Sequence, residues 1–381
     1  MVLNKSTPEA KSDRIKISKE ILARAITLGA NGVGISPAII PGPDTGGFRE
    51  YQEWVSSGKH GEMAYMSRVP ESRKDITRWF APARSVVVCA FSYHDGAPTA
   101  DLGPDQGRLA RYCLPPDYHD ILKERMTRLL DYCRQIRPGC SGKVFVDTSP
   151  VMERLYARHA GIGWVGKNSM LIAPDAGSFL LLAGLALDLE LEYDSPLPDR
   201  CGKCERCLKA CPTQALVKPR VLDATRCIAY TTVELRRGGI PEPLRASHGG
   251  WIFGCDACQE VCPWNRFAER NRKARHRGAS RAPYPLGAKP GGTLVPRMAS
   301  SQTLSDLAGL TSETFSKRFK GTPIKRTGYT AFLRNVLLAM GVSGDSRHRT
   351  ALERFSRHPD PVLSEQARWS LARLESDRIR E

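Results

Sequence analysis

Eight cysteines between residues 201 and 262 have the spacing with the clearest chemical meaning in this chain. The first run reads Cys-x2-Cys-x2-Cys-x3-Cys-Pro, and the second reads Cys-x2-Cys-x3-Cys-Pro with a separate cysteine upstream. Thiolates on such short turns can face one iron–sulfur cubane while nearby backbone amides point at its sulfurs. CxxC pairs also bind zinc. Eight cysteines with a proline after each closing cysteine favour clusters over zinc.

The same spacing predicts which cysteines share a cluster. In the two-cluster bacterial ferredoxin pattern, the fourth cysteine of each run crosses to the other cluster. One [4Fe-4S] cluster is therefore assigned to Cys201, Cys204, Cys207 and Cys262, and the other to Cys211, Cys227, Cys255 and Cys258. Two neighbouring clusters conduct electrons, so the rest of the chain is expected to hold what they reduce.

A second candidate for chemistry is Asp147, which ends an apolar stretch within VDTSPVMER. Open α/β sheets place ligands at the carboxyl ends of strands, and a carboxylic acid there can donate a proton if burial raises its pKa. The alternative is structural, because Asp147 or Thr148 could cap the following helix. The glycine-rich turn at 161–169 resembles a phosphate cradle, but it follows a helix and is not a Walker loop.

The net charge of +17 over 381 residues predicts a polyanionic partner, with nucleic acid first and simple solubility as the alternative. No apolar run has the length of a membrane span, and the N-terminus shows no export signal. A cytoplasmic protein outside the membrane is expected. The remaining cysteines are expected to be free thiols in a reducing compartment, namely Cys89, Cys113, Cys133 and Cys140.

The elements that must position these residues follow from apolar periodicity. Helices are predicted at 15–28, 118–136 and 149–159, and strands at 32–35, 85–93, 142–146 and 179–187. The alternation predicts an α/β domain over 1–195, with a mixed strand order left open, in a multidomain chain of the α+β/α/β class. A polar linker at 191–199 leads to a cluster module in 196–275, and a basic loop at 266–297 follows. The last part, 276–381, shows helical patterns at 324–340, 351–355 and 361–374, which resemble a small HEAT-like repeat or an ordinary helical cap.

Several segments together resemble the epoxyqueuosine reductase family, the cobalamin-dependent iron–sulfur enzymes of queuosine biosynthesis. The matching segments are ARSVVV at 83–88, DYH at 117–119, VDTSPVMERLYARHAGIGWVGKNSMLI at 146–172, VLDATRCIAYTTVE at 221–234, WIFGCDACQEVCPWN at 251–265, and the C-terminal FLRNVLLAMG and HPDPVLSEQARWSL. The resemblance covers nearly the whole chain. Ala229 departs from the usual serine, and CLPP at 113–116 replaces a glycine-bearing turn.

The resemblance implies a nitroreductase-like α/β domain that binds base-off cobalamin, a bacterial-ferredoxin-like module with two [4Fe-4S] clusters, and a HEAT-like tail that binds tRNA. It implies reduction of epoxyqueuosine to queuosine at the wobble position of tRNA, with Asp147 as the acid and an external low-potential electron donor. A monomer is expected. The implied cofactor contacts are Arg73, Tyr118, Arg154, Lys167, Asn168, Ser169 and Asp256. The expected tRNA contacts are Lys325, Arg326 and Arg334.

Two other functions and one other ligand role fit the sequence less well. A reductive dehalogenase shares the cobalamin and ferredoxin plan, but that class typically carries a twin-arginine signal and needs no basic helical tail. An electron-transfer ferredoxin on a scaffold leaves Asp147 and the glycine turn without a role. His119 is a poor candidate for a cobalt ligand, because Leu122 occupies the glycine position of the DxHxxG pattern.

Overall fold

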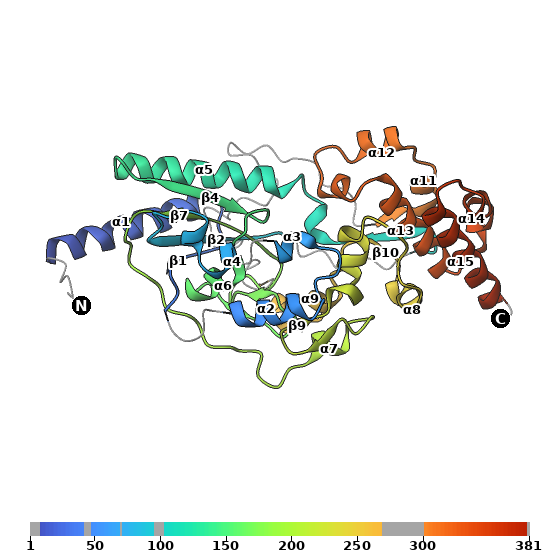
Figure 1. Ribbon diagram of the computed structural model, residues 1–381, viewed down its shortest axis with the longest axis horizontal. Coiled ribbons are helices and arrows are strands. Elements are labelled where there is room, and N and C mark those ends of the chain that lie inside the picture. The colour runs from blue at the N-terminus through green and yellow to red at the C-terminus, as the bar shows by residue number, and fades with distance from the viewer. Residues whose placement is uncertain (1–7, 42–46, 69–70, 95–102, 269–300, 379–381) are drawn as a thin grey trace.

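The computed structural model describes residues 8–41, 47–68, 71–94, 103–268 and 301–378 (Figure 1). The basic loop predicted at 266–297 lies outside the described residues, apart from its first three positions. Figure 1 shows a layered domain with α1 at one end of the molecule and the helices α11 to α15 at the other. Within the described residues, no helix combines the length and apolar character needed to cross a membrane.

The layered domain is built on a four-stranded sheet in the order β1-β2-β7-β4. Its strands are β1 (Gly32–Pro37), β2 (Ser85–Ser92), β7 (Leu180–Leu187) and β4 (Gly142–Val146). Every neighbouring pair is antiparallel, so the predicted α/β type is corrected to an antiparallel α+β sheet. Because helices cover both faces of the sheet, β2 and β7 are buried almost throughout, as strands of a parallel sheet are. Their apolar sequences therefore do not indicate whether the strands run parallel or antiparallel.

Three helices cover the two faces of this sheet. On one face α1 (Pro8–Thr27) and α5 (Tyr118–Ile136) bury residues such as Ile21 and Leu122. On the other face α6 (Glu153–His159) buries Tyr156. α5 begins where the sequence predicts, because the side chain of Asp117 caps it by accepting the His119 N–H.

The start of α6 differs from the prediction. The helix begins at Glu153 instead of Ser149, and its N-cap is Met152, which makes no side-chain cap. Neither Asp147 nor Thr148 caps this helix, so the structural alternative for Asp147 is wrong. Pro150 disfavours helical backbone at the residue before it, which explains the late start.

The cluster module is fastened to one edge of the four-stranded sheet by buried side-chain amides. Gln259 donates to the Tyr93 hydroxyl at 3.2 Å, and Asn265 accepts the Ser178 N–H at 2.7 Å. Tyr93 follows β2 and Ser178 precedes β7, so the module meets the edge at which β4 also ends. Buried, satisfied polar contacts of this kind fix a single relative position.

The C-terminal helices form a separate core around α13 (Tyr329–Val342), with Phe332, Leu337 and Leu363 inside. The helix predicted at 324–340 starts later, because Gly328 at φ 83° separates α13 from a 3₁₀ turn over Pro323–Thr327. A small sheet crosses the three predicted domains, since it takes β3 (Gln106–Leu109) from the first, β10 (Trp251–Phe253) from the second and β11 (Ser301–Thr303) from the third.

The remaining described elements are short, apart from the last helix. They are α2 (Phe48–Ser56), α3 (Ala64–Ser67), α4 (Glu71–Lys74), β5 (Trp164–Val165), β6 (Leu171–Ile172), α7 (Arg206–Lys209), β8 (Leu216–Lys218), β9 (Val221–Leu222), a π-helix (Tyr230–Glu234), α8 (Glu242–Arg245), α9 (Ala257–Glu260), α11 (Leu304–Ala308), α12 (Ser312–Arg318), α14 (Arg349–Ser356) and α15 (Pro361–Arg378).

Candidate active site and cluster module

Asp147 lies directly after β4, with its backbone in the left-handed region at φ 47°. Its side chain is 55% exposed. The Tyr118 hydroxyl donates to Asp147 Oδ2 at 3.0 Å, and His119 Nε2 lies 2.9 Å from the same oxygen. The first turn of α5 and the end of β4 therefore meet at one carboxylate.

The other ring nitrogen of His119 continues this chain of contacts. His119 Nδ1 lies 2.6 Å from Asp117 Oδ1, and Arg326 donates to Asp117 Oδ2 from Nη2 at 3.0 Å and Nε at 3.2 Å. Burial alone would lower the pKa of His119, but its bonds to Asp117 and Asp147 outweigh burial and raise the pKa to about 9. His119 thus carries a proton at neutral pH.

The pKa of Asp147 moves opposite to the expectation. Partial burial acts to raise this pKa, but the hydrogen bond and charge of His119, with the Tyr118 hydrogen bond, lower it. At neutral pH the shared proton rests on the imidazole and Asp147 is ionised. The sequence argument had placed the proton on Asp147 itself.

Glu153 supplies a second proton-bearing group beside Asp147. Its Oε1 accepts the Asp147 N–H at 2.6 Å. Burial and the nearby Asp147 charge raise the pKa of Glu153 to about 8. This carboxyl, on the first residue of α6, is therefore mostly protonated at neutral pH.

The predicted cofactor residues of the glycine turn lie between β5 and β6. Arg154 donates to the Ser169 carbonyl and so joins this turn to α6. Asn168 is 4% exposed and uses its oxygen to accept the Met170 N–H at 3.2 Å. The Nδ2 of Asn168 and the Oγ of Ser169 are buried and find no partner among the described residues. The half-buried Lys167 follows Gly166, and its carbonyl accepts the Arg220 N–H at 3.0 Å.

The two remaining predicted cofactor residues are Arg73 and Asp256, which come from other parts of the chain. Arg73 in α4 donates to the Tyr65 carbonyl at 3.1 Å. Burial, followed by the charges of Glu234 and Asp147, raises the pKa of Tyr65, which places this pair near the Asp147 carboxylate. Asp256 is buried, and its Oδ2 accepts the Arg111 N–H at 2.7 Å. It thereby ties the cluster module to the segment that precedes α5.

The charges that act on two buried thiols link the eight cysteines of the module into two sets. Burial, followed by the charges of three neighbouring thiolates, raises the pKa of Cys262 to about 11, and those neighbours are Cys201, Cys207 and Cys204. The pKa of Cys258 is raised by burial and by a different set, Cys255, Cys227 and Cys211. The crossing rule predicts these same two sets as the ligands of two clusters, and that assignment stays a prediction. A backbone amide also reaches a thiol, since Ala215 N donates to Cys211 Sγ at 3.2 Å.

The predicted tRNA contacts have three different environments. Lys325 is exposed. Arg326 is 43% exposed but is paired with Asp117. Arg334 is fully buried and donates to the carbonyls of Thr231, Leu235 and Gly238 at 2.6, 3.0 and 2.8 Å. The prediction that Arg334 contacts a tRNA phosphate is therefore wrong in this conformation. Its guanidinium satisfies carbonyls of the π-helix and the residues after it, which would otherwise be buried without donors.

Sequence reasoning missed several residues of this arrangement. It did not assign a role to Asp117, Glu153, Gln259 or Asn265, and it considered His119 as a poor candidate for a cobalt ligand. Asp117 carries the signal of an N-cap two residues before His119. Gln259 and Asn265 fall within the matched cysteine segment, but nothing in their types indicates that they hold the module to the sheet.

Comparisons with known proteins identify the family to which this chain is similar. A family model described as "4Fe-4S double cluster binding domain" matches residues 200–265, and one described as "Epoxyqueuosine reductase QueG, DUF1730" matches residues 73–148. The first model favours iron–sulfur clusters over zinc in the cysteine module. The epoxyqueuosine reductase of Gloeobacter violaceus is 37% identical over 329 residues, which cover 86% of this chain and 97% of the relative. That of Escherichia coli K12 is 33% identical over 365 residues, covering 94% and 90%.

Solved structures give the same assignment. A crystal structure of epoxyqueuosine reductase with an epoxyqueuosine-modified tRNA-Tyr stem loop matches with a TM-score of 0.79 and 27% identity, covering 94% of this chain and 90% of that one. The Bacillus subtilis enzyme, solved with an aspartate-bearing catalytic loop swung out of the active site, matches with the same TM-score and identity. Because relatives above 30% identity match over nearly their whole length, this chain belongs to the epoxyqueuosine reductase family.

Proposed function

We propose that this chain reduces epoxyqueuosine to queuosine at the wobble position of tRNA, with electrons passing through two [4Fe-4S] clusters to cobalamin and a proton delivered through Asp147. One observation carries the proposal. The first turn of α5 places Tyr118 and His119 on the Asp147 carboxylate, at the sheet edge to which the double-cluster module is fastened. The nitroreductase-like and HEAT-like assignments, the three-domain division and the cytoplasmic location are parts of the same proposal.

The chemistry of the reaction matches these parts. Converting an epoxide to an alkene breaks two carbon–oxygen bonds, consumes two electrons and two protons, and releases water. Iron–sulfur clusters pass single electrons. Cobalamin would supply a centre that stores an electron pair beside the substrate.

The residues of the glycine turn fit such a cofactor. The buried Asn168 Nδ2 and Ser169 Oγ have no partner among the described residues, so a polar ligand beside them would satisfy both. Residues that would hold it with them are Arg73, Tyr118, Arg154 and Lys167, while Asp256 fixes the neighbouring cluster loop.

The Asp147 group can hold and deliver a proton. His119 is only 12% exposed and stores the proton, whereas Asp147 is 55% exposed and offers an oxygen to a substrate. Asp117 contacts Nδ1 of the imidazole and is itself held by Arg326, which keeps Nε2 of His119 directed at Asp147. Glu153 stands next to Asp147 as a source for the second proton.

One of the two cysteine groups is linked to this site through neighbouring residues. The π-helix begins three residues after Cys227 and ends at Glu234, whose pKa is raised first by burial and also by the charge of Asp147. Asp256, beside Cys255, bonds the backbone of Arg111. We therefore take the group of Cys211, Cys227, Cys255 and Cys258 as the inner cluster. The group of Cys201, Cys204, Cys207 and Cys262 is the outer one.

The test uses anaerobically reconstituted protein, a strong reductant and an anticodon stem-loop that carries the epoxide. We expect loss of one oxygen from the modified base, detected by mass spectrometry, when both clusters and cobalamin are loaded. The same protein without cobalamin should leave the base unchanged. Loaded protein that leaves the epoxide intact would contradict the proposed reaction.

A further inference from the structure

The outer cluster group is accompanied by a regular series of positive charges. The segment 200–209 reads RCGKCERCLK, so a cation precedes each of its three cysteines and a fourth follows two residues after the last. These cations are Arg200, Lys203, Arg206 and Lys209. Only Glu205 opposes them within the segment. The cations therefore recur at every third position, in step with the cluster ligands.

In the structure, all four of these side chains are exposed. None of them forms an ion pair within the described part of the chain, although Arg220 nearby is paired with Asp199. Unpaired cations gathered around one site create a local positive potential that attracts an acidic surface. We call Lys203, Arg206 and Lys209 the basic rim, because these three also border a hollow at the protein surface.

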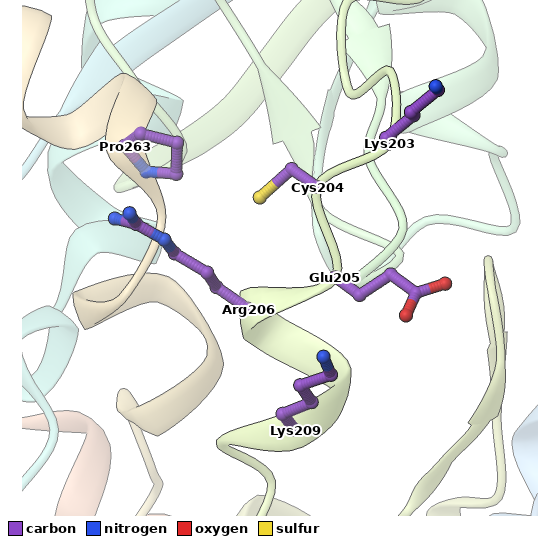
Figure 2. Close-up of a pocket in the computed structure, with 6 residues that line it drawn as sticks. All are labelled: Lys203, Cys204, Glu205, Arg206, Lys209 and Pro263. Carbon is purple, nitrogen blue, oxygen red and sulfur yellow. The ribbon is translucent and has the colours of Figure 1, made fainter.

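The basic rim surrounds an open hollow in which a cluster ligand is accessible. The hollow has a volume of about 430 Å³ and is lined by Cys204, Glu205, Pro263 and the three rim residues. Figure 2 shows the Cys204 sulfur directed toward Pro263, with the Arg206 guanidinium beside that proline. The cysteine spacing assigns Cys204 to the group taken above as the outer one. The cluster edge that Cys204 would hold thus lies at the protein surface.

The rim also lies away from the site of the nucleotide chemistry. In Figure 1, α7, which carries Arg206 and Lys209, is at the lower edge of the molecule, whereas α5 runs along the upper edge. Asp147 contacts the first turn of α5. A tRNA must bring its modified base to Asp147, so this distant rim fits a partner that exchanges only electrons.

We propose that the basic rim is the electron-entry face, and that it docks a small acidic one-electron carrier protein over the Cys204 side of the outer cluster. This rests on the proposed function, because it takes the group of Cys204 as the outer one. Each docked carrier is oxidised by one electron and the outer cluster is reduced by that electron. Two carriers serve one epoxide. Weak, charge-guided contacts of this kind suit a partner that must leave after each transfer.

The test compares two charge-matched triple variants of the holoenzyme. The rim variant is Lys203→Glu, Arg206→Glu, Lys209→Glu, and the control on the exposed surface of α1 is Lys11→Glu, Lys16→Glu, Lys19→Glu. Both remove the same net charge. The probe is a reduced acidic flavodoxin, and stopped-flow absorbance follows its oxidation by the holoenzyme over a salt series. Iron content verifies that the clusters assemble, and the triple glutamine rim variant replaces the glutamate one if they do not.

We expect the second-order rate constant of the rim variant to fall about 10- to 100-fold at low salt, with a flatter salt dependence, while the control changes little. Epoxide reduction driven by saturating dithionite should stay at the wild-type rate in both variants. Equal flavodoxin rates in the rim variant and the wild type would overturn the proposal. An equal loss of rate in the control variant would overturn it as well. Weaker stem-loop binding by the rim variant, with flavodoxin oxidation unchanged, would also overturn it and would make the rim a nucleic-acid contact. Failure of the proposed reaction is distinguishable, because the wild type would then not reduce the epoxide with dithionite.

Discussion

Replacing His119 with glutamine tests whether the imidazole is the proton store of the site. His119 bridges Asp117 at 2.6 Å and Asp147 at 2.9 Å. The glutamine amide can still hydrogen-bond a carboxylate, but it cannot carry the extra proton. The variant His119→Gln therefore removes both a proton and the positive charge that separates two carboxylates.

The size of the effect on stability follows from the pKa of His119, which rises from 6.5 to about 9. At 1.36 kcal/mol per unit, such a rise corresponds to about 3 kcal/mol. Because Asp147 is 55% exposed, water screens part of this interaction, and we expect about 1–2 kcal/mol. The folded state binds the proton more tightly than the unfolded state. The stabilisation is therefore complete below pH 6.5 and is lost as the pH rises through about 9.

Two measurements check this reasoning. Urea unfolding at about pH 6 should show His119→Gln to be about 1–2 kcal/mol less stable than the wild type, and the difference should shrink by about pH 10. In single-turnover epoxide reduction, the wild-type rate should fall as the pH rises through about 8 and then about 9, where Glu153 and then His119 lose their protons. The variant should be slower by about 100-fold or more at neutral pH, as expected for loss of a positioned proton donor.

The matched control is Asp120→Asn, which removes one exposed charge from the same helical turn. It leaves the contacts of His119 with Asp117 and Asp147 in place. It should keep the wild-type rate and pH profile. A His119→Gln enzyme with the wild-type rate and profile would refute the proton store. A stability difference that is equal at both pH values would show that the pKa of His119 is not raised.

Three further predictions follow from the site and the module. Asp147→Asn should lower single-turnover reduction about 100- to 10,000-fold with iron content and melting temperature near wild type, and a wild-type rate would remove Asp147 from the mechanism. Arg334→Met should lower the free energy of unfolding by about 3–5 kcal/mol, because it leaves buried carbonyls without donors. Lys325→Met should instead leave stability within about 0.5 kcal/mol and reduce the salt slope of stem-loop binding by about one, so equal unfolding energies for the two variants would contradict these assignments. Reconstituted wild type should hold about eight irons per chain, Cys204→Ser should hold fewer and Cys89→Ser the same number, whereas about four irons or bound zinc in the wild type would contradict the two-cluster assignment.

The sequence by itself determined the features that depend on neighbours along the chain. Cluster ligands on short turns are recognisable from their spacing, because the chemistry needs three thiolates within a few residues of one another. The bounds of α5 and β4 were predictable for the same reason, since a local N-cap at Asp117 and a short apolar run at 142–146 are sufficient to define them.

Only the tertiary structure decided how these parts meet. It set the antiparallel strand order, and it brought His119 to Asp147 across 28 positions of the chain. It also buried Arg334 among carbonyls, although the residue type alone suggests a surface contact. A pKa or a partner depends on what packs around a side chain. For that reason Asp147 could be selected from the sequence, while the residue that holds its proton was fixed by the fold.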